Sequence, residues 1–275
     1  MAKIKNAPIK NFGNAFLKFA LSKGVDYIAM GHYAKRVDKD GKAYLCKSFD
    51  QNKDQTYFLS QISQEQLSYS LFPLGDINKS EVRRIAHELN LNIADKKDST
   101  GICFIGERNF REFLKNYIPA NKGDIVDIET NRVIGHHDGV MYYTIGQRKG
   151  LGIGGIKGEE AKGWFVVNKD VKKNILYVAS SSESDYLYSD SCIVKHLNFI
   201  TDIPKEGQHI YAKFRYRQKD NGVTIHFIDE DTIKLIFDEP YASVTPGQAA
   251  VLYDKVICLG GGLIDATYKG NKRVN

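Results

Sequence analysis

One cysteine of this chain lies where its thiol could do chemistry. Cys103 stands within residues 98–106 (DSTGICFIG), a segment of small, polar and glycine residues. Lys96 and Lys97 lie just upstream, and a helix pattern begins at Arg108. Cations and the N-terminus of a helix both favour a thiolate. Cys103 is therefore a candidate reactive thiol, and the alternative is a small hydrophobe packed between its two apolar neighbours.

A run of six polar residues, Asp50 to Gln55, precedes a short helix pattern at residues 56–59. Amide and charged groups at this density suit contacts with a sugar-phosphate backbone or with base edges. The alternative is a solvated loop that carries no function.

Residues 209–218 predict a β-strand with two unlike faces. Period-2 alternation places Ile210, Ala212, Phe214 and Tyr216 on a packing face. The opposite face would carry three cations, Lys213, Arg215 and Arg217. Each phosphate that such a cation neutralises adds about one unit to the salt dependence of binding. The competing interpretation is an edge strand protected by charge.

Residues 142–155 (YYTIGQRKGLGIGG) combine two tyrosines, two cations and five glycines. Such a segment could lay backbone and charge along a nucleic acid and offer rings for stacking. A flexible β-turn region is the alternative. The glycine spacing matches neither a dinucleotide-binding fingerprint nor a phosphate-binding loop of the Walker type.

The elements that position these residues follow from hydrophobic periodicity. Residues 9–23 and 78–90 predict amphipathic helices, and Asn78 is a candidate cap of the second. Residues 25–30 predict a short buried strand that delivers Gly31 and His32 at its carboxyl end, where ligands gather in α/β sheets. The alternative for this histidine is an ordinary strand-end residue bonded to backbone.

The rest of the chain predicts β structure. A hairpin through residues 34–46 would turn at Asp40-Gly41. From about Gly123 onward, short alternating segments broken by glycine and Asn turns indicate a mostly β region, with hairpins at 164–178 and 223–237. Three cysteines lie in apolar strand patterns that favour packing: Cys46, Cys192 and Cys258.

Composition sets broad limits. The 275 residues carry a formal net charge of +6, which permits a polyanionic partner without requiring one. No apolar run approaches the roughly 18 residues that span a bilayer, so we expect a cytoplasmic protein without a membrane partner. The four cysteines form no C-x-x-C pair, so their spacing predicts no metal site and no disulfide framework.

Taken together, the motifs resemble those of the tRNA-specific 2-thiouridylases. The matching segments follow in family order over nearly the whole chain: 27–33, 52–55, 96–108, 141–152, 214–218 and 245–248. The resemblance implies the remainder of an α/β adenylating domain of the pyrophosphate-loop ATPase type (1–106), a small mostly β central domain (107–173) and a C-terminal β-barrel domain (174–275).

The family chemistry then implies the cofactors and partners. ATP, with Mg²⁺ by family expectation, adenylates the C2 oxygen of the wobble uridine of tRNA, and a persulfide on Cys103 supplies the sulfur, which a persulfide sulfur-donor protein delivers. By motif, Gly31 would touch ATP. Seven residues would contact tRNA: His32, Lys53, Asp54, Gln55, Arg215, Tyr216 and Gln248.

Two departures from the family pattern matter. The family's S-G-G-x-D-S pyrophosphate loop does not occur in these residues, so we expect a truncated chain that is inactive alone, with an incomplete sheet whose edge invites self-association. The family's second, resolving cysteine has no counterpart near residues 5–10, and the nearest thiol in sequence is Cys46. The alternatives are a non-catalytic tRNA-binding or RNA-binding module and a cysteine hydrolase that uses Cys103.

Overall fold

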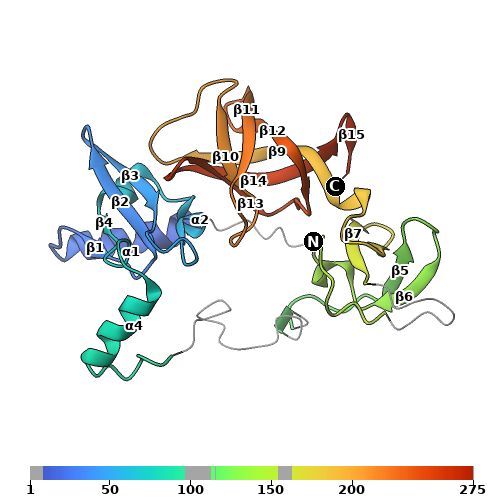
Figure 1. The fold of residues 1–275 in the computed structure, drawn as a ribbon, viewed down its shortest axis with the longest axis horizontal. Helices are drawn as coiled ribbons and strands as arrows, with labels where there is room; N and C mark the ends of the chain where they lie inside the picture. Colours follow the sequence, from blue (N-terminus) through green and yellow to red (C-terminus); the bar gives the residue numbers. More distant parts are fainter. Residues whose placement is uncertain (1–8, 97–112, 115, 154–162, 275) are drawn as a thin grey trace. The chain divides into compact units, whose positions relative to one another are not determined.

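The computed structural model describes residues 9–96, 113–114, 116–153 and 163–274 (Figure 1). They fall into two compact units. The first unit holds the described residues up to Lys96 together with 192–238 and 247–265. The second holds the described residues from 113 to 191 together with 239–246 and 266–274.

In the first unit, the described residues up to Lys96 contain the helices and a small parallel sheet of two strands. The helices are α1 (Ile9–Ser22), α2 (Thr56–Leu59), α3 (Gln64–Ser68) and α4 (Lys79–Glu88). β1 (Ile28–Ala29) pairs in parallel with β4 (Ser70–Leu71), so the predicted strand at 25–30 is shorter than expected.

The N-terminus of α4 is capped by a different residue from the one predicted. Asn78 occupies the N-cap position, but its side chain makes no capping bond. Instead Asp50 accepts a hydrogen bond from the Lys79 N–H at 3.0 Å, which places a carboxylate at the positive end of the helix dipole. None of the α4 side chains is buried. The 50–55 loop is thus tied to the start of α4.

The predicted hairpin is confirmed. β2 (Ala34–Lys39) pairs with β3 (Lys42–Lys47), and Asp40 and Gly41 form the turn with φ of 51° and 75°. Two consecutive left-handed residues are what the tight hairpin turn of type I′ requires.

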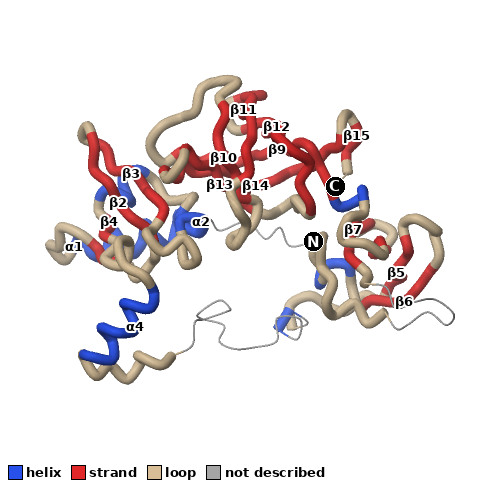
Figure 2. The backbone as a smooth tube through the Cα atoms, in the orientation of Figure 1, coloured by secondary structure: helices blue, strands red, loops and turns tan. Residues whose placement is uncertain are grey.

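Six strands pair in a closed order to form a β-barrel, which Figure 2 draws among the strands of the sheet. Their order is β13, β10, β11, β12, β9, β14, and pairing of β13 with β14 closes the barrel. The strands are β9 (Tyr188–Phe199), β10 (His209–Lys213), β11 (Asn221–Asp229), β12 (Thr232–Ala242), β13 (Ala249–Asp254) and β14 (Ile257–Lys269).

The α/β segment and the barrel share a core within the first unit. Ile257 on β14 pairs with Cys46 on β3, which joins the hairpin to the barrel sheet. One buried cluster contains Leu45 and Leu67 from the first segment and Val251 from the barrel. Burial of common apolar surface therefore fixes the α2 region against the barrel.

The second unit is built on a four-stranded sheet in the order β6, β5, β8, β7. Its strands are β5 (Gly123–Asp127), β6 (Val133–His137), β7 (Phe165–Asp170) and β8 (Ile175–Ala179), and its short 3₁₀ helices are η1 (Val140–Tyr142) and η2 (Asp185–Leu187). The strand β15 (Lys272–Arg273) pairs with the end of β14. Both hairpins predicted for the β region, β7–β8 and β11–β12, are confirmed.

One strand prediction was wrong. The strand predicted over 209–218 ends at Lys213; the segment that follows, the 214–220 turn, has bends and a turn at 214–217 and irregular backbone after them. The predicted alternation already fails at Lys213, which is buried. Within the described residues, no helix has the length and apolar character needed to cross a bilayer.

Candidate nucleic-acid interface

The hydroxyl of Tyr57 brings three distant segments together. It donates to the carbonyl oxygen of Ala249 at 3.1 Å and lies 3.4 Å from that of Phe214. Burial raises the pKa of Tyr57 to about 12, so the phenol remains a donor at neutral pH. This single group ties α2, the 214–220 turn and the start of β13 to one another.

Aromatic rings extend this junction. The rings of Phe58 and Tyr216 lie 4.4 Å apart between centroids at 40°, and Tyr57 meets Phe58 edge-on at 5.7 Å. Phe58 is 48% exposed. A half-exposed ring held by other rings offers a surface on which a nucleobase can stack.

An ionic cluster joins the 50–55 loop to β10. Lys213 Nζ lies 3.8 Å from Asp54 Oδ2 and 3.7 Å from Asp220 Oδ1, and Lys47 contacts the other oxygen of Asp220. Both lysines are 8% exposed and Asp54 is 4% exposed, whereas the Asp220 side chain is 31% exposed. The two cations and two carboxylates compensate one another, which is the condition for burying charge.

This cluster overturns one expectation and limits another. Lys213 was predicted on a solvent-facing cationic surface, but it points inward because its two carboxylate partners come from the 50–55 loop and the 214–220 turn. The alternative of a solvated 50–55 loop fits the exposed Gln51 and Asn52 but not Asp54, which is buried and accepts hydrogen bonds from the Ser48 N–H at 3.1 Å and the Thr56 hydroxyl at 2.8 Å. Long-range partners decide both cases.

Tyr253 completes the cluster from the barrel side. Its ring lies 4.5 Å from the Lys47 ammonium group and 5.4 Å from that of Lys213. Its hydroxyl lies 3.2 Å from that of Thr56. Burial raises the pKa of Tyr253, so this phenol stays neutral. Two cations held near one aromatic ring help to fix the relative positions of β3, β10 and β13.

Gln55 links the same loop to the end of β1. The side-chain oxygen of Gln55 accepts a hydrogen bond from the Tyr33 N–H at 2.9 Å, and the backbone N–H of Gln55 donates to the Tyr33 carbonyl at 2.7 Å. His32 precedes Tyr33, and burial lowers the pKa of its imidazole. Gly31 is exposed, and a Cβ there would meet no atom within 4 Å. The carboxyl end of β1 therefore leaves room for a ligand.

Gln248 lies beside Ala249, one of the Tyr57 acceptors. Its side-chain oxygen is buried and has no hydrogen-bond partner in the described part of the chain. A buried amide oxygen without a partner is costly unless a ligand or water supplies a donor.

The predicted residues thus divide into two groups. The structure brings together the segments that carry the first group: Gln55 bonds Tyr33, which follows His32, and Tyr57 bonds Phe214 and Ala249, which adjoin Arg215 and Gln248. Cys103 and the whole 98–106 segment lie outside the described residues. Sequence reasoning missed Phe58, Lys47 and Asp220. Phe58 carried a signal, since it belongs to the short aromatic helix pattern that follows the polar run 50–55, whereas the other two carried none.

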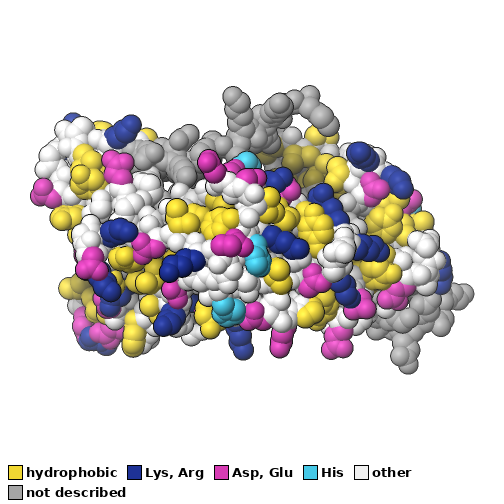
Figure 3. All heavy atoms as spheres, turned by 90° about the horizontal axis from the view of Figure 1, so that it is seen from above, with side chains coloured by type: hydrophobic (Ala, Val, Ile, Leu, Met, Phe, Trp, Pro, Cys, Tyr) yellow, Lys and Arg dark blue, Asp and Glu magenta, His cyan; other side chains and the backbone are white. Residues whose placement is uncertain are grey.

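Charges of both signs are mixed on the face of the protein drawn in Figure 3. Lys and Arg side chains there are interspersed with Asp and Glu. The part of the chain that the structure describes contains no cluster of three or more His, Cys, Asp or Glu side chains suited to a metal ion. Recognition of a polyanion would therefore depend on local groups such as those at Tyr57 and not on net charge.

Three family models match the chain in succession. They are described as a tRNA methyl transferase HUP domain over residues 5–107, a tRNA methyl transferase PRC-barrel domain over 111–180, and an aminomethyltransferase beta-barrel domain over 189–264. The tRNA-specific 2-thiouridylase MnmA of Bacillus cytotoxicus is 51% identical over 262 residues, which cover 95% of this chain and 69% of the relative. This chain belongs to the tRNA-specific 2-thiouridylase family.

Other 2-thiouridylases agree with this assignment. The enzyme of Mycoplasma capricolum is 55% identical over 92% of this chain and 69% of its own length. That of Staphylococcus carnosus is 54% identical over 93% of this chain and 68% of its own length. The predicted fold class of a 2-thiouridylase, an α/β region, a mostly β central domain and a C-terminal β-barrel, is confirmed.

Proposed function

We propose that this chain acts in the 2-thiolation of the wobble uridine of tRNA, with Cys103 as the persulfide sulfur carrier. The observation that carries the proposal is the convergence at Tyr57 of the segments expected to hold RNA. Two acceptor carbonyls, one beside Arg215 and one beside Gln248, meet its hydroxyl. Family membership supplies the reaction class.

The residues at this junction have distinct tasks in the proposal. Lys53 and Arg215 neutralise phosphates, Tyr216 stacks together with Phe58, and Gln248 offers its unpaired oxygen to a base or ribose donor. Asp54 is buried, so it acts by holding the loop that carries Lys53 and Gln55. His32, neutral because burial lowers its pKa, hydrogen bonds to the RNA beside Gln55.

The proposal assigns ATP to the carboxyl end of β1. The exposed Gly31 at the end of a parallel strand, with open space around it, fits a ligand there. ATP, when bound, turns the uridine C2 oxygen into an AMP leaving group. The role of the chain's own residues is to leave backbone accessible at Gly31 and to hold the base near His32.

Release of sulfur from Cys103 requires a second thiol. The described cysteines are poor candidates because all are buried: Cys46, Cys192 and Cys258. Burial raises the pKa of each thiol, that of Cys258 to about 12. We therefore propose that an external thiol, from the sulfur-donor protein or from solution, completes the transfer.

A direct assay tests the reaction. The purified chain is mixed with ATP, tRNA and a persulfide donor, and 2-thiouridine is measured by mass spectrometry of the digested tRNA. Product formed with wild type and not with Cys103→Ser would support the proposal, and it would overturn the expectation that this chain is inactive alone. Tight tRNA binding with no product in any condition would favour the non-catalytic RNA-binding alternative.

A binding assay tests the interface separately. Arg215→Ala should weaken tRNA binding and lower the slope of log K against log salt by about one unit. Lys205→Ala, which removes an exposed cation from the loop between β9 and β10, is the matched control. Equal slopes for Arg215→Ala and wild type would remove this turn from the interface.

We also propose that the β1–β4 sheet mediates self-association. Among the described strands, β1 pairs only with β4, and Tyr27 and Leu71 beside this edge are 52% and 42% exposed. An unpaired apolar edge favours strand addition. Leu71→Lys should shift the protein toward monomer in sedimentation experiments, and an unchanged distribution would refute this contact.

A further inference from the structure

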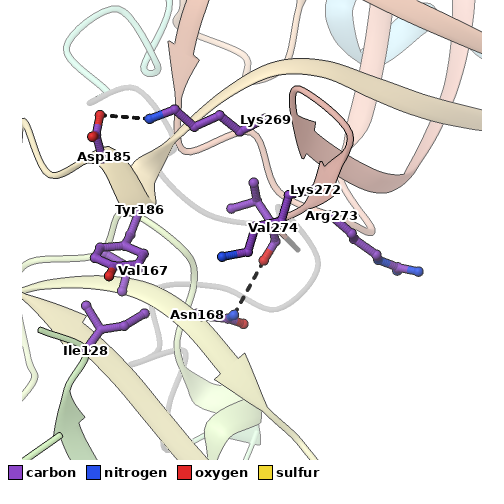
Figure 4. Close-up of a pocket in the computed structure, with 9 residues that line it drawn as sticks. All are labelled: Ile128, Val167, Asn168, Asp185, Tyr186, Lys269, Lys272, Arg273 and Val274. Carbon is purple, nitrogen blue, oxygen red and sulfur yellow. Dashed lines mark hydrogen bonds and ion pairs between the residues drawn. The ribbon is translucent and has the colours of Figure 1, made fainter.

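A second candidate site lies in the second unit, and none of its lining residues belongs to the proposed interface. A cavity of about 380 Å³ is lined by residues of β7, η2 and the β14–β15 hairpin (Figure 4). Its size falls within the range of sites that bind small ligands. The basic hairpin at its rim lies beyond residue 264, where the match to the barrel family model ends.

The cavity combines an aromatic and apolar wall with a cationic rim. Tyr186, 41% exposed, stands near the apolar residues Ile128 and Val167. Three cations, Lys269, Lys272 and Arg273, and one carboxylate, Asp185, line the cavity, and a second carboxylate, Asp190, binds the hairpin at Gly270. Lys269 pairs with Asp185 at 2.8 Å, and the three cations exceed the two carboxylates by one charge.

Hydrogen bonds hold this rim in place. The Gly270 N–H donates to the Asp190 carboxylate, and the Val274 N–H donates to the Thr267 carbonyl at 2.8 Å. The Asn168 amide donates to the Val274 carbonyl at 3.4 Å. The cations are therefore carried by a fixed hairpin, which lowers the entropy lost on binding.

We propose that this cavity is a nucleotide subsite, in which a base stacks on Tyr186 while its phosphate contacts Lys272 and the neighbouring phosphate contacts Arg273, whose side chain points away from Tyr186 (Figure 4). An aromatic ring beside cations is the arrangement that binds single-stranded nucleic acid. The Asn168 side chain is already engaged, since its oxygen accepts from the Lys169 N–H at 2.6 Å and its nitrogen donates to Val274. The subsite therefore binds without reading base identity.

The nucleotide comes from tRNA in this inference, which rests on the proposed function. Filter binding of tRNA at several salt concentrations compares wild type with Lys272→Ala/Arg273→Ala, for which the salt slope should fall by about two units. Lys172→Ala/Lys173→Ala, which removes two exposed cations from the β7–β8 turn, is the matched control and should retain a steeper slope.

Variants at Tyr186 test stacking. Tyr186→Ala should weaken tRNA binding roughly fivefold to a hundredfold, whereas Tyr186→Phe should bind like wild type. Ultraviolet cross-linking followed by mass spectrometry should find a nucleotide adduct on Tyr186 of the wild-type protein. Thermal unfolding of each variant separates lost binding from lost folding.

The outcomes distinguish the sources of the nucleotide. An unchanged salt slope in the double variant together with no adduct at Tyr186 would overturn the inference. Adducts formed with nucleoside monophosphates but not with tRNA would assign the cavity to free nucleotides and overturn its role in RNA binding. If wild type does not bind tRNA at all, the proposed function itself fails. If Arg215→Ala weakens tRNA binding and the variants of this subsite do not, the proposed function is retained and only this subsite is rejected.

Discussion

Lys213 Nζ on β10 lies 3.8 Å from Oδ2 of Asp54, in a loop that precedes α2. The pair is buried and is joined by Asp220, which also contacts Lys47. Two loops that carry candidate RNA-binding residues are therefore anchored to one ionic cluster. Their positions depend on its integrity, because a buried charge that loses its partner is costly.

Removal of the central cation should be strongly destabilising. Lys213→Met leaves the buried carboxylate of Asp54 without its ion-pair partner, and we expect the free energy of unfolding to fall by about 3–5 kcal/mol. Urea unfolding measures this change. Lys195→Met removes a half-exposed partner of Asp265 and should cost about 0–1 kcal/mol. Similar losses for the two variants would show that the cluster contributes no more than a surface pair.

Truncation of the exposed ring should affect RNA more than folding. Phe58→Ala removes a ring at 4.4 Å from Tyr216, and tRNA affinity should fall by roughly fivefold to a hundredfold. Fluorescence anisotropy with labelled tRNA gives the affinity. Phe19→Ala, an exposed aromatic residue of α1, serves as the control. Undiminished affinity for Phe58→Ala would exclude it from the interface.

The stability of the first unit should depend on His32 below neutral pH. Burial lowers the pKa of His32 from 6.5, so between the lowered pKa and 6.5 the unfolded chain binds more protons than the folded one. The stabilising contribution is present above pH 6.5 and is lost as pH falls through the lowered value. The free energy of unfolding should therefore drop less on acidification in His32→Gln than in wild type. Parallel urea curves at each pH for the two proteins would contradict this assignment.

Thiol labelling should single out one cysteine. Burial raises the pKa of Cys46, Cys192 and Cys258, so these thiols should resist iodoacetamide in the native protein and react in denaturant. Cys103 should react in the native protein, as a sulfur carrier must. Mass spectrometry of labelled peptides identifies the sites. Native labelling of Cys46 at the rate of Cys103 would restore it as a candidate second thiol.

Local signals predicted much of the fold. The Asp40-Gly41 dipeptide specified its hairpin because both residues accept a left-handed conformation, and φ values of 51° and 75° are found there. Alternating apolar residues located the β7–β8 and β11–β12 hairpins. In each case the determining interactions lie within a few residues along the chain, so the sequence contains them directly.

Contacts between residues distant along the chain determined the parts of the fold that local patterns did not predict. Alternation along 209–218 predicted an outward Lys213, but the carboxylates of Asp54 and Asp220 draw it inward and the strand ends there. Likewise no local pattern shows that the Tyr57 hydroxyl would join the Phe214 and Ala249 carbonyls. The sequence by itself determined the family, the element types and the candidate residues. Only the tertiary structure decided which of them meet, because burial and charge compensation depend on residues that are distant along the chain.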